Sequence, residues 1–188
     1  MAPALFCTGW MGVVRRVAIT CVCCLSALVG CARAPTHSPA AGLVESDRVR
    51  VQGVLGHLTP ALKDRRISVA LDETPRVGAY AWPDGRLLLT RGLVRLLDDD
   101  ELAAAVAHEL GHLVSDGDFH TAAALSGAGP ARDAEVRADA AGRVMLLSAG
   151  YVPDAMATML EKVAASPGLS NDCRARLRDR IARLRAGY

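Results

Sequence analysis

Two histidines four residues apart, within a stretch of strong helical periodicity, are the feature that most constrains this chain. They belong to the segment His108-Glu109-Leu110-Gly111-His112. Residues four apart project from one face of a helix, so both imidazoles can reach the same tetrahedral ion, with Glu109 beside the open coordination position. Such a helix needs a partner element that supplies a third protein ligand. The alternative is a solvated helix face carrying two ordinary histidines.

The sequence after this motif discriminates among third ligands for a zinc ion. Metzincins place Gly at position 115 and His at position 118, where this chain has Ser115 and Asp118, so that class is excluded. His120 follows a glycine-containing loop and is assigned to the surface. Glu135 is the better candidate, because it opens the next long helix, and Asp139 one turn later could accept the outer N–H of a ligand histidine. The alternative is a solvated pair of acids balanced by nearby arginines.

The first thirty residues have the pattern of an export signal. Arg15-Arg16 is followed by an apolar run at residues 17–29, which is too short for a comfortable membrane span. Gly30 then precedes Cys31, and this ending resembles the lipobox of bacterial lipoproteins. It predicts that residues 1–30 are removed and that Cys31 carries the lipid anchor. The alternative is an apolar signal that happens to contain cysteine.

Cysteine usage and charge agree with an exported protein. Five of the six cysteines lie at or before position 31, so Cys173 alone remains in the mature chain and no intramolecular disulfide is expected. The excess of 22 basic over 20 acidic residues comes from Arg15 and Arg16 in the predicted signal, so the mature chain is balanced, which disfavours nucleic acid as a partner. The expected partners are envelope proteins or peptides as substrates, and a membrane reached through Cys31. Ala32 after the cysteine indicates the periplasmic side of the outer membrane.

Local patterns predict an α+β fold that is mostly helical, in one domain. Residues 31–42 would be the lipidated cysteine and a flexible tether rich in Pro, Ser, Ala and Gly, and residues 43–188 the domain. Short β-rich runs at 67–71 and 86–90, with the turn Pro83-Asp84-Gly85 between them, predict a small antiparallel meander. Helices are expected at residues 43–63, 100–114, 130–150, from 153 onward and 169–184.

Residues 67–142 resemble the zinc metallopeptidases that include HtpX, the CAAX prenyl proteases and the periplasmic BepA- and LoiP-type enzymes. Residues 79–85 are similar to the family's Asn-Ala-Phe-Ala-x-Pro-Gly-Gly turn, and the resemblance continues at 88–93 and 101–107 up to the two ligand motifs. It implies a zincin-like domain with the His-Glu-x-x-His motif on its active-site helix. Some periplasmic members are membrane-anchored lipoproteins, which agrees with the prediction for Cys31.

The same resemblance implies the role of each site residue. One zinc ion per chain would be bound by His108, His112 and Glu135, with Glu109 as the general base and Asp139 orienting the site. The chain departs from the family at residues 170–174, where members usually carry His-Pro, and at Gly78, where Asn is common. The sequence therefore does not identify the group that stabilises the oxyanion. The candidates are the zinc ion, Tyr80, Tyr151 and Arg174.

The expected activity is metal-assisted peptide hydrolysis. Zinc would polarise the scissile carbonyl and lower the pKa of its bound water to about 7, while Glu109 takes the water proton and passes it to the leaving amine. Substrate is expected to pair through its main chain along the strand formed by Arg86, Leu87, Leu88, Leu89 and Thr90. Misfolded or unassembled envelope proteins fit such a site. The alternatives are a zinc-dependent envelope chaperone or assembly factor with little or latent proteolytic activity, and a purely structural lipoprotein.

Overall fold

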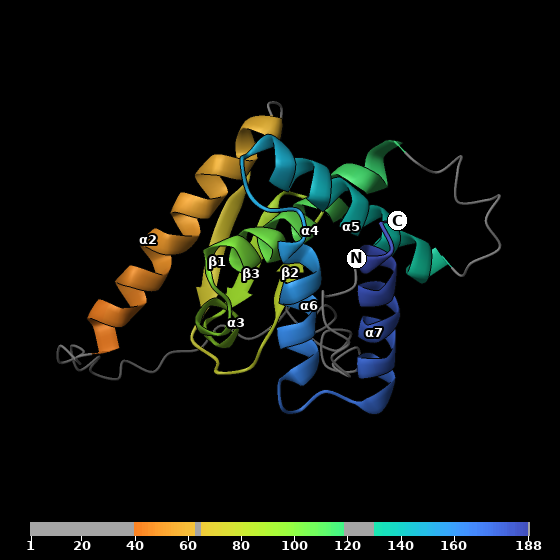
Figure 1. Ribbon diagram of the computed structural model, residues 1–188. Coiled ribbons are helices and arrows are strands. Elements are labelled where there is room, and N and C mark those ends of the chain that lie inside the picture. Colours follow the sequence, from red (N-terminus) through yellow and green to blue (C-terminus); the bar gives the residue numbers. More distant parts are fainter. Residues whose placement is uncertain (1–39, 63–64, 119–129, 188) are drawn as a thin grey trace, which may run out of the picture.

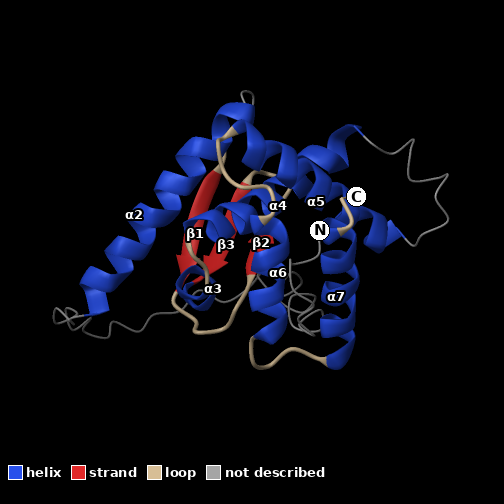
Figure 2. Ribbon diagram, viewed as in Figure 1, coloured by secondary structure: helices blue, strands red, loops and turns tan. Residues whose placement is uncertain are grey.

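A small sheet lies among six helices (Figure 2). The computed structural model describes residues 40–62, 65–118 and 130–187. In that part of the chain the strands are β1 (Ser68–Asp72), β2 (Ala79–Ala81) and β3 (Arg86–Thr90). The helices are α2 (Ala40–Leu58), α3 (Arg91–Leu96), α4 (Asp99–Asp118), α5 (Pro130–Ser148), α6 (Ala155–Ala165) and α7 (Asn171–Arg185), and Thr59–Leu62 form a 3₁₀ turn, η1. The architecture agrees with the predicted α+β class and its helical bias.

Helix α4 is the centre of the fold. Each of its residues from 101 to 113 is buried, and it packs against α2, α5, α6 and β2 (Figure 1). Its first turn is closed by a reciprocal pair, in which the Glu101 N–H donates to Asp98 Oδ1 and the Asp98 N–H donates to Glu101 Oε2. This pair satisfies two backbone donors, and the acidic first turn complements the helix dipole. The helix that carries both histidines is thereby fixed from its beginning.

The sheet is mixed, and the predicted antiparallel meander is wrong in one pairing. The strand order is β1-β3-β2, with β2 antiparallel to β3 and β1 parallel to β3. β2 and β3 form a hairpin through the turn at Gly85, whose φ of 88° suits glycine. β3 takes the middle position because it carries Leu87 and Leu89, which are exposed by only 1% and 0%, whereas β1 is half-exposed.

This strand order also corrects the expected substrate strand. Residues Arg86–Thr90 are paired along one side with β1, and Leu87–Leu89 are paired along the other side with β2. Main-chain pairing of a substrate with β3 is therefore wrong, because β1 and β2 already occupy both of its edges. Among the described strands, β2 and β1 are the ones with an edge that no other strand covers.

Two glycines let α4 and α5 approach closely. A Cβ atom placed on Gly111 would lie 2.4 Å from the carbonyl oxygen of Ala138. A Cβ atom on Gly142 would lie 3.1 Å from the carbonyl group of Ala107 and 2.7 Å from Met156 Cε. Both approaches are shorter than van der Waals contact allows, so a larger residue would push the helices apart. The spacing of the two helices therefore depends on these positions.

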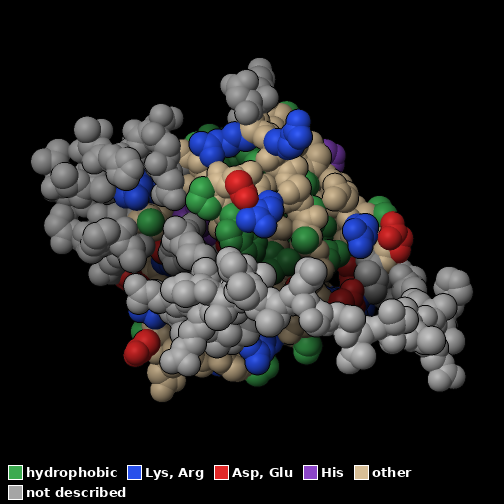
Figure 3. Space-filling view, turned by 180° about the vertical axis from the view of Figure 1, so that it is seen from behind, with side chains coloured by type: hydrophobic (Ala, Val, Ile, Leu, Met, Phe, Trp, Pro, Cys, Tyr) green, Lys and Arg blue, Asp and Glu red, His purple; other side chains and the backbone are tan. Residues whose placement is uncertain are grey.

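The side of the sheet away from α4 bears a shallow apolar groove. Its lining comes from β1, β3 and the turn before β3, namely Ser68, Val69, Ala70, Trp82, Arg86, Leu87 and Leu88. The Arg86 guanidinium lies 5.5 Å from the centre of the Trp82 ring. Seen from behind, hydrophobic side chains gather near the centre of the described surface, with Lys and Arg side chains among them (Figure 3).

The predicted signal peptide, Cys31 and His120 lie outside the described residues. The tether predicted for residues 31–42 overlaps the structure at its end, where α2 begins at Ala40. None of the helices in the described ranges combines the length and hydrophobicity needed to cross a membrane.

Candidate metal centre

The two histidines of α4 and one glutamate of α5 converge. His108 and His112 are exposed by 0% and 1%, and their Nε2 atoms lie 3.1 Å apart. Glu135 brings Oε2 to 3.4 Å from His108 Nε2 and Oε1 to 3.6 Å from His112 Nε2. Within the described residues, all three side chains thus offer ligand atoms to one point in space.

These separations suit a single four-coordinate ion. Atoms bound to zinc at about 2.0–2.1 Å in a tetrahedron lie about 3.3–3.4 Å from one another. The two Nε2 atoms are 3.1 Å apart, which is close to that value. Each has a different oxygen of Glu135 nearby, Oε2 at 3.4 Å from His108 and Oε1 at 3.6 Å from His112, and one ligand atom from each residue lies within 4.8 Å of the other two. Imidazole nitrogen and carboxylate oxygen are also ligand types that zinc accepts, and three protein ligands leave a fourth position open. The residues therefore fit a zinc ion.

Asp139 fixes the orientation of the first histidine. It lies one turn after Glu135 on α5, and its Oδ1 accepts a hydrogen bond of 2.8 Å from His108 Nδ1. With the proton on Nδ1, the lone pair of Nε2 faces His112 and Glu135. This is the arrangement expected of Asp139 from the sequence.

Both nitrogens of the His108 ring face carboxylates, and this affects its protonation. Burial and the charge of Arg180 oppose protonation, but the hydrogen bonds to Asp139 and Glu135 outweigh them and raise the pKa of His108 to about 8. The carboxyl groups respond in the opposite sense. Burial raises the pKa of Glu135 and of Asp139, yet His108 and Arg180 bring both pKa values below their usual range.

Zinc uptake at neutral pH should release a proton from His108. Below about pH 8 the metal-free ring holds two protons, whereas a metal ligand must offer a bare Nε2, so zinc affinity should fall as the pH is lowered. Calorimetric titration with zinc at pH 7 in buffers of different ionisation enthalpy measures this release. An enthalpy independent of the buffer would contradict the prediction.

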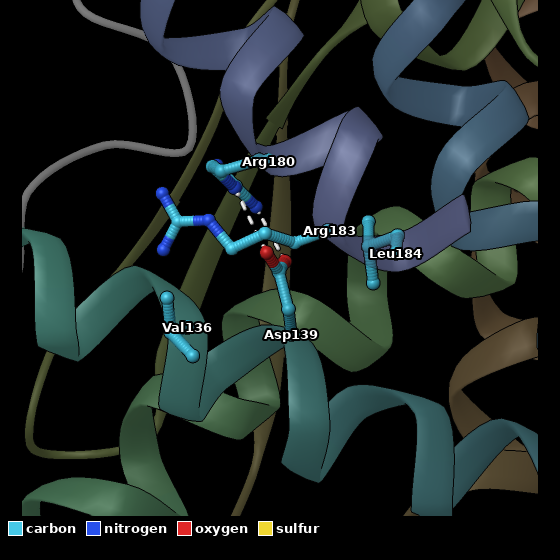
Figure 4. Close-up of a pocket in the computed structure, with 5 residues that line it drawn as sticks. All are labelled: Val136, Asp139, Arg180, Arg183 and Leu184. Atoms are coloured by element: carbon cyan, nitrogen blue, oxygen red, sulfur yellow. Dashed lines mark hydrogen bonds and ion pairs between the residues drawn. The ribbon is translucent and has the colours of Figure 1, made fainter. Parts of the chain in front are cut away.

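Arg180 of α7 is a residue of this centre that sequence reasoning missed. Its Nε donates to Asp139 Oδ2 at 2.9 Å, its Nη2 donates to Asp139 Oδ1, and its Nη1 donates to Glu135 Oε2 at 2.7 Å. Figure 4 shows the guanidinium of Arg180 aimed at the Asp139 carboxylate across the gap between α7 and α5. Helical spacing carried a signal for it, because Arg180 shares the buried stripe of Cys173, Leu177 and Leu184.

Glu109, the expected general base, follows His108 on α4 and is fully buried. Burial lowers the pKa of Arg180, but the charges of Asp139, Glu135 and Glu109 outweigh it and raise that pKa. Glu109 therefore belongs electrostatically to the same cluster as the ligand candidates.

Two of the residues considered for oxyanion stabilisation are engaged elsewhere. The terminal nitrogens of Arg174 donate to the carbonyl oxygens of Ala164 and Ser166 at the end of α6. The hydroxyl of Tyr151 lies 3.0 Å from His57 Nδ1. Both side chains thus have roles in packing and in closing a helix end, while Tyr80 stays on the edge strand β2.

Two buried histidines on one helix and a carboxylate on the next have the arrangement of the protein ligands in the mononuclear centres of zinc peptidases. The comparison with protein families agrees, because residues 50–130 match peptidase family M48. A curated protein described as "Protease HtpX homolog", from Thermoplasma acidophilum, is 41% identical over 49 residues, which are 25% of this chain and 16% of that protein. The resemblance to zinc metallopeptidases of the HtpX type is therefore confirmed.

Both matches cover only part of the chain. The aligned segment spans about a sixth of the relative's length. The family match includes His108, Glu109 and His112 but ends before Glu135, Asp139 and Arg180. Those three residues are assigned to the centre by geometry alone.

Proposed function

We propose that this chain is a zinc-dependent endopeptidase, anchored by Cys31 to the periplasmic side of a bacterial cell envelope, that cleaves misfolded or unassembled envelope proteins. The match to a peptidase family supports a metalloprotease. The observation that carries the proposal is the convergence of His108, His112 and Glu135 at separations that suit one zinc ion.

In the proposed mechanism each residue of the centre has a separate task. His108, His112 and Glu135 would bind zinc, which supplies Lewis-acid polarisation and an acidified water. Glu109 accepts the proton of the attacking water and delivers it to the leaving amine. Asp139 keeps the proton of His108 on Nδ1, so the ligand nitrogen stays available.

The edge strand β2 is the better place for substrate than the strand first expected. It packs against α4, and one of its edges is not covered by another described strand. An extended peptide that pairs with Ala79–Ala81 would be recognised mainly through its main chain. Weak dependence on side chains supports unfolded proteins as the substrate class.

Cleavage of casein or of a denatured porin by the domain that follows Cys31 tests the proposal. We expect cleavage that stops when zinc is removed by a chelator and returns when zinc is added. Folded porin serves as the control substrate and should resist. Cleavage that persists after complete zinc removal would exclude the proposed mechanism.

The anchor makes a separate prediction. A Cys31→Ser variant should fail to incorporate labelled fatty acid and should leave the membrane fraction, because the thiol that receives the lipid is absent. Cys173→Ser is the matched control, since that cysteine is buried in the folded domain. Membrane association of the Cys31→Ser protein, with no label in the parent, would show that the lipobox interpretation is wrong.

A further inference from the structure

Arg180 occupies an unusual place for an arginine. It is exposed by 6%, and no other lysine or arginine of the described residues is buried. The guanidinium is hydrogen-bonded to the carboxylates of Glu135 and Asp139. A buried charge of this kind is tolerated only when it is paired and hydrogen-bonded, and Arg180 satisfies that condition through both α5 acids.

The contacts of Arg180 are directional. A planar guanidinium holds its N–H groups in a fixed geometry, and two of them donate hydrogen bonds to the two oxygens of Asp139. A third N–H binds Oε2 of Glu135, which leaves Oε1 as the oxygen nearest to His112. One side chain thus sets the rotation of both carboxylates.

The effect reaches the histidine through Asp139. Nη2 of Arg180 also lies 3.2 Å from His108 Nδ1, but both of these nitrogens carry hydrogens, so Asp139 Oδ1 accepts from each. The carboxylate that holds the His108 ring is therefore itself held from α7. Asp139 and Glu135 lie 41 and 45 residues before Arg180, so this control comes from a distant part of the chain.

We propose that Arg180 is the positioning residue of the metal centre, which makes helix α7 a part of that centre. By fixing Asp139 and Glu135 it aligns the ligand atoms of His108 and Glu135 toward one point. This inference rests on the proposed function, because it takes these side chains as zinc ligands.

Charge and geometry make opposite predictions about this arginine. A nearby positive charge repels a divalent cation, so if Arg180 acted only as a charge its removal would tighten zinc binding. If it positions the ligands, its removal weakens zinc binding, and partners of metal ligands typically contribute about 10–100-fold in affinity. The sign of the change therefore separates the two roles.

The test compares Arg180→Met and Arg180→Lys with Arg183→Met, by competition for zinc with a chromophoric chelator and by the visible absorption spectrum of the Co²⁺-loaded proteins. Arg183 is a matched control, because it lies on the same helix and pairs with Asp179, and Figure 4 shows its guanidinium directed away from Asp139. We expect about 10–100-fold weaker zinc binding and a changed Co²⁺ spectrum in Arg180→Met. Arg180→Lys should also be weakened, since one ammonium cannot replace the planar guanidinium, and Arg183→Met should match the parent.

Unchanged or tighter zinc binding in folded Arg180→Met would overturn the inference. Circular dichroism establishes folding, and if Arg180→Met does not fold then Arg180→Lys decides, because it keeps the charge. Parental affinity and an unchanged Co²⁺ spectrum in that variant would overturn the inference as well. A parent protein that binds neither zinc nor Co²⁺ would instead refute the proposed function, and the inference with it.

Discussion

Replacing Glu109 by Gln should lower peptide cleavage by a factor of a hundred or more while zinc stays bound. Glutamine keeps the size of the buried side chain but cannot accept the water proton, and a general base typically contributes about 10²–10⁴-fold to the rate. Measurement of casein cleavage beside the zinc content of the same preparation checks both halves of this expectation. Loss of zinc together with activity would mean that Glu109 is a ligand and that its assigned role is wrong.

The same variant separates the enzyme from the chaperone alternative. If hydrolysis is the function, a strain that depends on this protein should not be rescued by Glu109→Gln. If the protein instead holds unfolded clients, the variant should rescue fully and still suppress client aggregation. We expect no rescue, because His108, His112 and Glu135 converge beside the expected base. Full rescue would favour the chaperone.

Removal of both histidines should abolish zinc binding. The double variant His108→Ala/His112→Ala leaves one of three ligands, so the zinc content should fall from about one ion per chain to near zero. Glu135→Gln should weaken binding without abolishing it, because two imidazoles remain and an amide oxygen is a poorer ligand. Metal analysis after dialysis measures the three proteins together.

His57→Ala is the control for these variants, since His57 lies on α2 and contacts Tyr151 rather than the centre. It should keep the parental zinc content. Equal zinc in the parent and the double-histidine variant would remove the proposed site.

The sequence allowed prediction of those parts of the centre that depend on local spacing. His108 and His112 share a helix face because they are four residues apart, and Asp139 follows Glu135 by the same interval. The helix limits were also close to the observed ones, since Asp98 and Pro130 are strong start signals. The motif alone did not show that α5 packs against α4 so that Glu135 lies level with the histidines. The structure places Glu135 within 3.6 Å of both.

The parts that were missed depend on contacts between distant segments. The order β1-β3-β2 follows from which strand buries more, and the short apolar runs at 67–71 and 86–90 look alike in the sequence. Arg180 lies in a helix with five other arginines, so composition does not single it out as the buried one. Its burial requires acids that lie 41 and 45 residues away, and helix periodicity alone does not reveal them.

The close packing of α4 against α5 also constrains the two positions written x in His-Glu-x-x-His, which are Leu110 and Gly111 in this chain. Leu110 is exposed by 0%, and the space beside Gly111 is taken by the Ala138 carbonyl. In this chain the residue types at these two positions are therefore also restricted. The restriction comes from the space available and not from metal chemistry. A redesign that kept only the histidines and the glutamate would alter the distance between the two ligand-bearing helices. Gly111 therefore limits how far α4 and α5 are kept apart, and so the distance between the histidines and Glu135.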